Sequence, residues 1–189
     1  MILSVLAALL LLLPVALGGR LSRLAQIRIA GRHWLLAGLL LQVAAIGLAG
    51  RVARPVLAAL HVSSYLVLGA VLWTNRSMPG AGLIGTGGLL NGVTITANGG
   101  TLPASVSAMH TAGLHTAGLT ADEDFSNSAP MESPTLWFLG DIFAIPASVP
   151  LANVFSVGDV IILGGVAVAA VGICGTHWSS PSSLSGTSR

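Results

Sequence analysis

Residues 160–178 read VIILGGVAVAAVGICGTHW, an uninterrupted run without a charged side chain. A helix that crosses the hydrocarbon core of a bilayer needs roughly 20 mostly apolar residues. Asp159 stands just before this run, and its last residue is Trp178. The stretch therefore predicts a membrane-spanning helix near the end of the chain.

The composition of the whole chain agrees with this interpretation. Of the 189 residues, 53% are apolar and only 7% are charged, and the mean hydropathy is +0.87. An ordinary soluble domain carries roughly 25% charged residues, and a disordered chain combines low hydrophobicity with high net charge. Both classes are excluded, which leaves an integral membrane protein.

Four more apolar segments precede this one, near residues 2–17, 34–49, 55–73 and 80–97. The first resembles a signal peptide, but no basic residue comes before it, so a retained helix is expected. The fourth is rich in glycine and contains the Gly-xxx-Gly pair Gly88 and Gly92. Such small residues let helices approach closely, so we predict that this segment packs among the others. The fold class expected is an all-α, polytopic transmembrane helix bundle with about five spans.

A long connection, residues 98–159, separates the fourth segment from the segment at 160–178 and contains all six acidic residues. Its apolar stretches, at 137–139 and 142–146, are too short to span a bilayer and predict a re-entrant or interfacial piece. The bundle is expected over residues 1–178. Residues 179–189, a stretch rich in serine with one glycine and one proline, predict a flexible tail.

The arginines predict how the chain sits in the membrane, because basic residues concentrate in cytoplasmic loops. With five spans and the N-terminus outside, the 18–33 loop, Arg76 and Arg189 would be cytoplasmic. That arrangement places six arginines inside and only two, Arg51 and Arg54, outside. The acidic connection would then be extracytoplasmic and the C-terminus cytoplasmic.

Short motifs follow one another in a definite order: an arginine-rich stretch at Arg20–Arg32, Gln42, Asn98-Gly99-Gly100 with Leu102-Pro103, Leu139-Gly140-Asp141 with Pro146, and Ser156-Val157-Gly158-Asp159. This order resembles the bacterial membrane family of domain of unknown function 5317. The resemblance implies a multi-pass protein of the bacterial plasma membrane. The family has no established activity, so the resemblance implies an architecture and no function.

Four polar side chains, Asn91, Asn98, Asp141 and Asp159, form a candidate polar site at one face of the membrane. Carboxylate and amide oxygens suit hard cations or a polar headgroup. Capping is the favoured alternative: Asp159 would cap the last helix and Asp141 a short re-entrant turn. Both interpretations stay open at this stage.

The remaining candidates for chemistry are weak. His110 and His115 are five residues apart and do not share a helix face, so we expect no metal site there. Cys174 is expected to be a buried, inert thiol. His61 is expected to be hydrogen-bonded inside the bundle, with a proton relay as the alternative. No catalytic residue and no cofactor is predicted.

Two functions remain open. The first is an integral membrane protein with a structural or accessory role, whose partners are the lipid bilayer and a second protein or a second copy, bound through the glycine-rich helices. The alternative is a small membrane enzyme or transporter that uses the candidate polar site. Nucleic acid is excluded as a partner, because the arginines flank an apolar segment and do not form a basic stripe.

Overall fold

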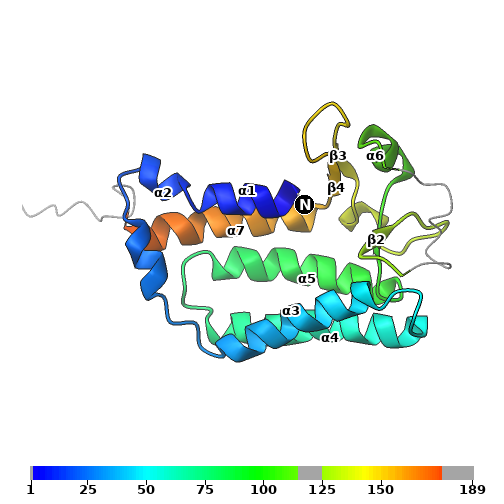
Figure 1. Ribbon diagram of the computed structural model, residues 1–189, viewed down its shortest axis with the longest axis horizontal. Helices are drawn as coiled ribbons and strands as arrows, with labels where there is room; N and C mark the ends of the chain where they lie inside the picture. Colours follow the sequence, from blue (N-terminus) through cyan, green and yellow to red (C-terminus); the bar gives the residue numbers. More distant parts are fainter. Residues whose placement is uncertain (1, 115–124, 176–189) are drawn as a thin grey trace, which may run out of the picture.

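The computed structural model describes residues 2–114 and 125–175, and its main helices lie side by side along the long axis (Figure 1). Neighbouring helices pack in the order α3 on α4, α4 on α5, α5 on α7 and α7 on α1. Their bounds are α1 Ile2–Leu10, α3 Arg32–Gly47, α4 Arg54–Thr74, α5 Ala81–Ala97 and α7 Val157–Cys174.

The two ends of this helical array differ in what they carry (Figure 1). The arginine end, on the left in Figure 1, holds α2 (Leu13–Ala16), the 3-10 helix η1 (Leu21–Gln26), the start of α3 and the turn between α4 and α5. The connection end, on the right, holds the turn between α3 and α4 and the elements between α5 and α7. Successive long helices therefore run in alternating directions.

Two helices, α4 with 21 residues and α7 with 18, are long and apolar enough to cross a membrane. Only 22% of the apolar window of each is buried inside the protein, unlike a core helix of a soluble protein. At about 1.5 Å per residue, α3 and α5 measure about 24 and 26 Å, somewhat less than a bilayer core of about 30 Å. Crossing by the other three apolar segments stays a prediction.

The first apolar segment is not one continuous helix. It forms α1 and then the short α2, with a break at Leu11–Leu12 just before the buried Pro14. Proline has no N–H to donate to the carbonyl four residues earlier, here Leu10, and its ring collides with that carbonyl. Helix α1 therefore ends at Leu10, so the expected helix over 2–17 is formed in two pieces.

Helices α5 and α7 meet along a glycine seam, formed by Gly80 and Gly87 on one side and Gly158 and Gly165 on the other. A Cβ atom built on Gly165 would lie 2.8 Å from the backbone nitrogen of Ile84, and one on Gly158 would lie 2.8 Å from the carbonyl oxygen of Gly87. The glycines repeat every seven residues, which keeps them on one helix face. Only glycine permits this backbone-to-backbone approach.

The seam differs from the one expected from the sequence pair Gly88 and Gly92. A Cβ on Gly88 would meet nothing within 4 Å, and one on Gly92 would face Tyr65 of α4. Helix α5 is also only half-buried: Asn91 and Ile95 are enclosed, whereas Leu89 is exposed. The prediction that α5 packs among its neighbours therefore holds for its sides toward α7 and α4 and not for its whole circumference.

The connection contains short strands, so the all-α expectation is corrected to mostly helical. The strand β1 (Leu102–Pro103) pairs in parallel with β2 (Ser128–Ala129), and β3 (Phe143–Ile145) pairs antiparallel with β4 (Asn153–Phe155). The helix α6 (Val106–Thr111) packs on β3 and β4. Strand pairing across long loops is a tertiary event that no local hydropathy pattern reveals.

A small core holds these elements together, formed by Ala104, Ala108, Met109, Ala112 and Val154. The aromatic rings of Phe143 and Phe155 stack at 5.4 Å across the β3–β4 pair. The 3-10 helix η2 (Trp137–Leu139) exposes the rings of Trp137 and Phe138, as an interfacial piece would. His115 and the tail at 179–189 lie outside the described residues.

A single methyl group tests the seam. Gly87→Ala places a Cβ against the backbone of Gly158 and should destabilise the protein by about 1–3 kcal/mol, the usual cost of overpacking. Gly88→Ala is the matched control: its Cβ enters open space, and alanine should favour the helix by about 0.5–1 kcal/mol. Thermal unfolding in detergent micelles measures both, and equal midpoints would contradict the seam.

Candidate functional site

A hydrogen-bonded network joins the middle of α5 to the start of α7. The side-chain amide of Asn91 donates to Asp159 Oδ1 at 3.0 Å, and its oxygen accepts from the Ser156 hydroxyl at 2.9 Å. Asn91 and Ser156 are buried, at 3% and 0% exposure. The glycine seam brings these groups together, because Gly158 lies directly against the Asn91 amide.

The same network caps α7. Ser156 is the N-cap: its hydroxyl accepts the N–H of Asp159 at 3.1 Å, while Asp159 Oδ2 accepts the N–H of Ser156 at 2.9 Å. This reciprocal arrangement is a capping box. Asp159 thus takes part in capping the last helix, as expected, but it does not precede the helix: α7 begins at Val157, the N-cap is Ser156, and Asp159 lies inside the first turn. The Ser-x-x-Asp spacing was the sequence signal for it.

Asn98 lies apart from this network, at the end of α5. Its amide nitrogen donates to the carbonyls of Thr94 at 2.7 Å and Thr135 at 2.8 Å, and its oxygen accepts the N–H of Thr135 at 2.8 Å. It follows Asn91 by seven positions, about 10 Å along the helix axis. Asn98 therefore ties the loop before η2 to α5, and its polar atoms are already used.

Asp141 extends the β1–β2 sheet. Its N–H donates to Pro103 O at 2.8 Å and its carbonyl accepts the N–H of Ser105 at 3.0 Å, which places it beside β1 on the side away from β2. Asp141 follows η2, whose N-cap is Leu136, so it does not cap that turn as the sequence suggested.

The carboxyl group of Asp141 is only 4% exposed, and within the described residues its Oδ1 has no hydrogen-bond partner. Burial raises the pKa of this carboxyl to about 7. The Ser128 hydroxyl beside it lowers the pKa, and the negative charge of Asp159 raises it. Asp141 thus lies within electrostatic reach of the Asn91 network, and of the four candidate residues it alone keeps an unused polar atom.

His61 lies in α4 below the connection. Its Nδ1 donates to the carbonyl of Gly100 at 2.6 Å, and its ring packs edge-on against Tyr65 and Phe125 at 5.6 and 5.9 Å. The prediction that His61 is hydrogen-bonded inside the protein is confirmed. Across the part of the chain that the structure describes, no three His, Cys, Asp or Glu side chains gather as a metal site.

Two polar ties at the arginine end were not expected from the sequence. The Asn75 side chain accepts the N–H of Ala30 at 2.9 Å and donates to its carbonyl at 3.0 Å, fixing the segment before α3. The carbonyl of Cys174, the last residue of α7, accepts from the backbone N–H of Arg20 at 3.0 Å and the Arg23 guanidinium at 3.4 Å. The thiol of Cys174 is buried, as predicted.

Together these features define a mostly helical protein with two helices apolar enough to cross a membrane, closed at one end by a small connection with buried polar groups. The model of a family of unknown function (DUF5317) matches residues 26–171, most of the chain. The chain belongs to this family, as its motifs suggested. No curated protein and no solved structure matches it significantly.

The Asn91–Asp159 pair can be tested by exchanging its two residues. Asp159→Asn should cost about 1–3 kcal/mol, because both carboxylate oxygens accept from N–H donors and an amide supplies only one acceptor. Asn91→Asp should cost at least as much, since it sets two carboxylates side by side. The double variant restores every donor and acceptor and should recover most of the stability. Additive losses in thermal unfolding would refute the network.

The buried Asp141 carboxyl predicts a pH dependence. The folded state keeps its proton up to about pH 7, whereas the unfolded chain loses it near pH 4. Stability should therefore fall as pH rises from about 4 to about 7 and then level off. Asp141→Asn, which carries no titrating group, should flatten this part of the profile. Glu132→Gln, which removes an exposed acid of the same connection, should keep the slope; a slope unchanged in Asp141→Asn would exclude Asp141 as its source.

Proposed function

We propose that this chain is a five-span integral protein of the bacterial plasma membrane with a structural or accessory role. Its N-terminus would lie outside and its C-terminus in the cytoplasm. The observation that carries the role is the state of the candidate polar site: three of its four residues, Asn91, Asn98 and Asp159, direct their hydrogen bonds to one another, to Ser156 or to the backbone. Side chains whose donors and acceptors are engaged in this way hold helices together and leave few polar atoms free to bind a substrate.

The membrane setting is supported by the outer surface of the helices. Large apolar side chains are exposed along them, among them Leu36, Leu40 and Val43 of α3, Leu66 of α4 and Leu89 of α5. Large exposed apolar surfaces are rare on soluble monomers and mark sites of contact with a partner or a membrane. In a bilayer these side chains would face lipid tails, while the helices satisfy their own backbone groups.

The distribution of charge supports the orientation. The 18–33 loop and Arg76 belong to the arginine end, and the acidic connection belongs to the opposite end (Figure 1). Basic residues favour the cytoplasmic side. The arginine end would therefore face the cytoplasm.

An accessory role requires a partner, which we propose to be a second membrane protein or a second copy. Gly80, Gly87, Gly158 and Gly165 are consumed by the seam inside the chain. Gly82 and Gly88 of α5 and Gly164 of α7 instead face open space, where a Cβ would meet nothing within 4 Å. Small outward-facing residues suit helix association in a membrane.

A second candidate function, a membrane enzyme or small-solute transporter, is favoured by one observation. Asp141 keeps a buried carboxylate oxygen without a partner in the described chain, and such an atom can bind a proton or a cation. The pH experiment on Asp141→Asn, repeated with sodium, potassium and magnesium salts, separates the two functions. A cation that stabilises the native protein and not the variant would favour the second candidate.

The proposed topology predicts the location of reporter domains. Fusions after Arg76 and after Arg189 should both report the cytoplasm, whereas a fusion after Arg51 should report the outside, because the arginine asymmetry orients the helices. One reporter is active only in the cytoplasm and the other only in the periplasm, so either location of a fusion gives a signal. An external signal at Arg189 combined with a cytoplasmic one at Arg76 would mean that the chain crosses an odd number of times after Arg76, and the five-span topology would fail.

A further inference from the structure

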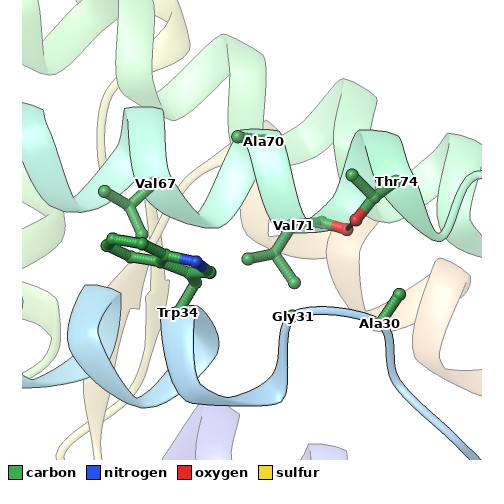
Figure 2. A pocket seen from close by; sticks show the side chains of 7 residues that line it. All are labelled: Ala30, Gly31, Trp34, Val67, Ala70, Val71 and Thr74. Carbon is green, nitrogen blue, oxygen red and sulfur yellow. Dashed lines mark hydrogen bonds between the residues drawn. The ribbon is translucent and has the colours of Figure 1, made fainter.

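An apolar groove of about 280 Å³ lies between the start of α3 and the last turns of α4, at the arginine end (Figure 2). Its wall is mostly apolar. The one hydroxyl in the wall, that of Thr74, is already hydrogen-bonded, because it donates to Val71 O at 2.7 Å. The indole of Trp34 lies over Val67 in Figure 2 and is 57% exposed. The groove is lined by Ala30, Gly31, Trp34, Val67, Ala70, Val71 and Thr74.

The groove is held open by the fold. Asn75 fixes both backbone polar groups of Ala30, and Gly31 adopts a left-handed conformation, φ +73°, which turns the chain into α3. A Cβ at Gly31 would lie within 4 Å of both Trp34 and Val71. A preformed groove binds a ligand without the cost of ordering its own walls.

Three arginines neighbour the lining residues of this groove in the sequence. Arg28 and Arg32 flank the lining residues Ala30 and Gly31 in sequence, and Arg76 follows Thr74 by two residues; all three are exposed. The guanidinium of Arg76 lies 5.0 Å from the centre of the Trp73 ring. All six acids of the chain lie between residues 122 and 159, so no acid precedes residue 122 to neutralise these arginines. The groove therefore combines an apolar wall with three exposed arginines within two residues of its lining in the chain.

We propose that the groove binds an anionic phospholipid, with part of one acyl chain against Trp34, Val67 and Ala70 and the phosphate among Arg28, Arg32 and Arg76. The proposal rests on the membrane location proposed above. Basic pockets between helices on the cytoplasmic side of a membrane are suited to anionic headgroups. The volume, at the low end of small-molecule sites, fits a segment of acyl chain and not a whole amphiphile.

The test titrates the purified full-length chain in a neutral detergent with phosphatidylglycerol, phosphatidylcholine or glycerol phosphate, and counts bound molecules by native mass spectrometry. Phosphatidylglycerol should bind best, and Arg32→Gln should weaken it about fivefold, the effect of one arginine near a membrane surface. Arg51→Gln is the matched control, because Arg51 also flanks α3 and lies at the opposite end.

The groove itself is tested by Ala70→Leu and Ala70→Trp, which fill it and should abolish the preference for phosphatidylglycerol. Ala59→Leu makes the same change at an exposed position of α4 outside the groove and should keep the preference. Two Ala70 variants are used in case one of them misfolds. An unchanged circular dichroism spectrum verifies that each variant is folded.

Three outcomes would overturn the proposal. Equal binding of the two lipids would show that the anionic headgroup is not recognised. Competition by glycerol phosphate at the same concentrations as the lipid would show that the acyl chain does not contribute to binding. An undiminished preference in both folded Ala70 variants would place the lipid elsewhere. Failure of the membrane topology is detected separately by the reporter fusions, which do not depend on lipid binding.

Discussion

The close approach of α5 and α7 at their glycines is the constraint on which the rest of the molecule depends. At Gly87 and Gly158 the two backbones meet with no space for a methyl group. This contact sets the register of the two helices and thereby brings Asn91 against Ser156 and Asp159. It also anchors both ends of the connection, which leaves α5 and re-enters α7 at one end of the array (Figure 1).

The polar groups that the seam encloses act mainly by satisfying one another. The free-energy cost of burying a donor or acceptor without a partner exceeds the net gain from one hydrogen bond. Asn91, Ser156 and Asp159 therefore stabilise the contact between α5 and α7 only as a complete set. The Asp141 carboxyl departs from this pattern: it is buried, one oxygen lacks a partner in the described chain, and its pKa is raised to about 7. A buried carboxyl with an unpartnered oxygen is the kind of group on which chemistry or regulation would act.

The opposite end is organised by different means. Its backbone is tied by Asn75 to Ala30 and by Arg20 and Arg23 to the last carbonyl of α7. The side chains of Arg28, Arg32 and Arg76 are exposed at this end, which also carries the apolar groove. The two ends thus differ in charge, because all the acidic residues belong to the connection.

The sequence by itself determined the apolar helices, the family, the buried Cys174 and the internal hydrogen bonding of His61, because hydropathy and short motifs are local properties. The sequence predicted Asn91 and Asp159 as site residues but not the contact between them. It predicted close helix packing at Gly88, whereas the glycine seam uses Gly87. Only the tertiary structure decided those points, together with the strands of the connection and the engagement of Asn98 by Thr135. The reason is physical: which of several glycines faces a neighbour depends on how two helices are rotated against each other, and that rotation is fixed by packing between residues as far as 68 positions apart in the chain.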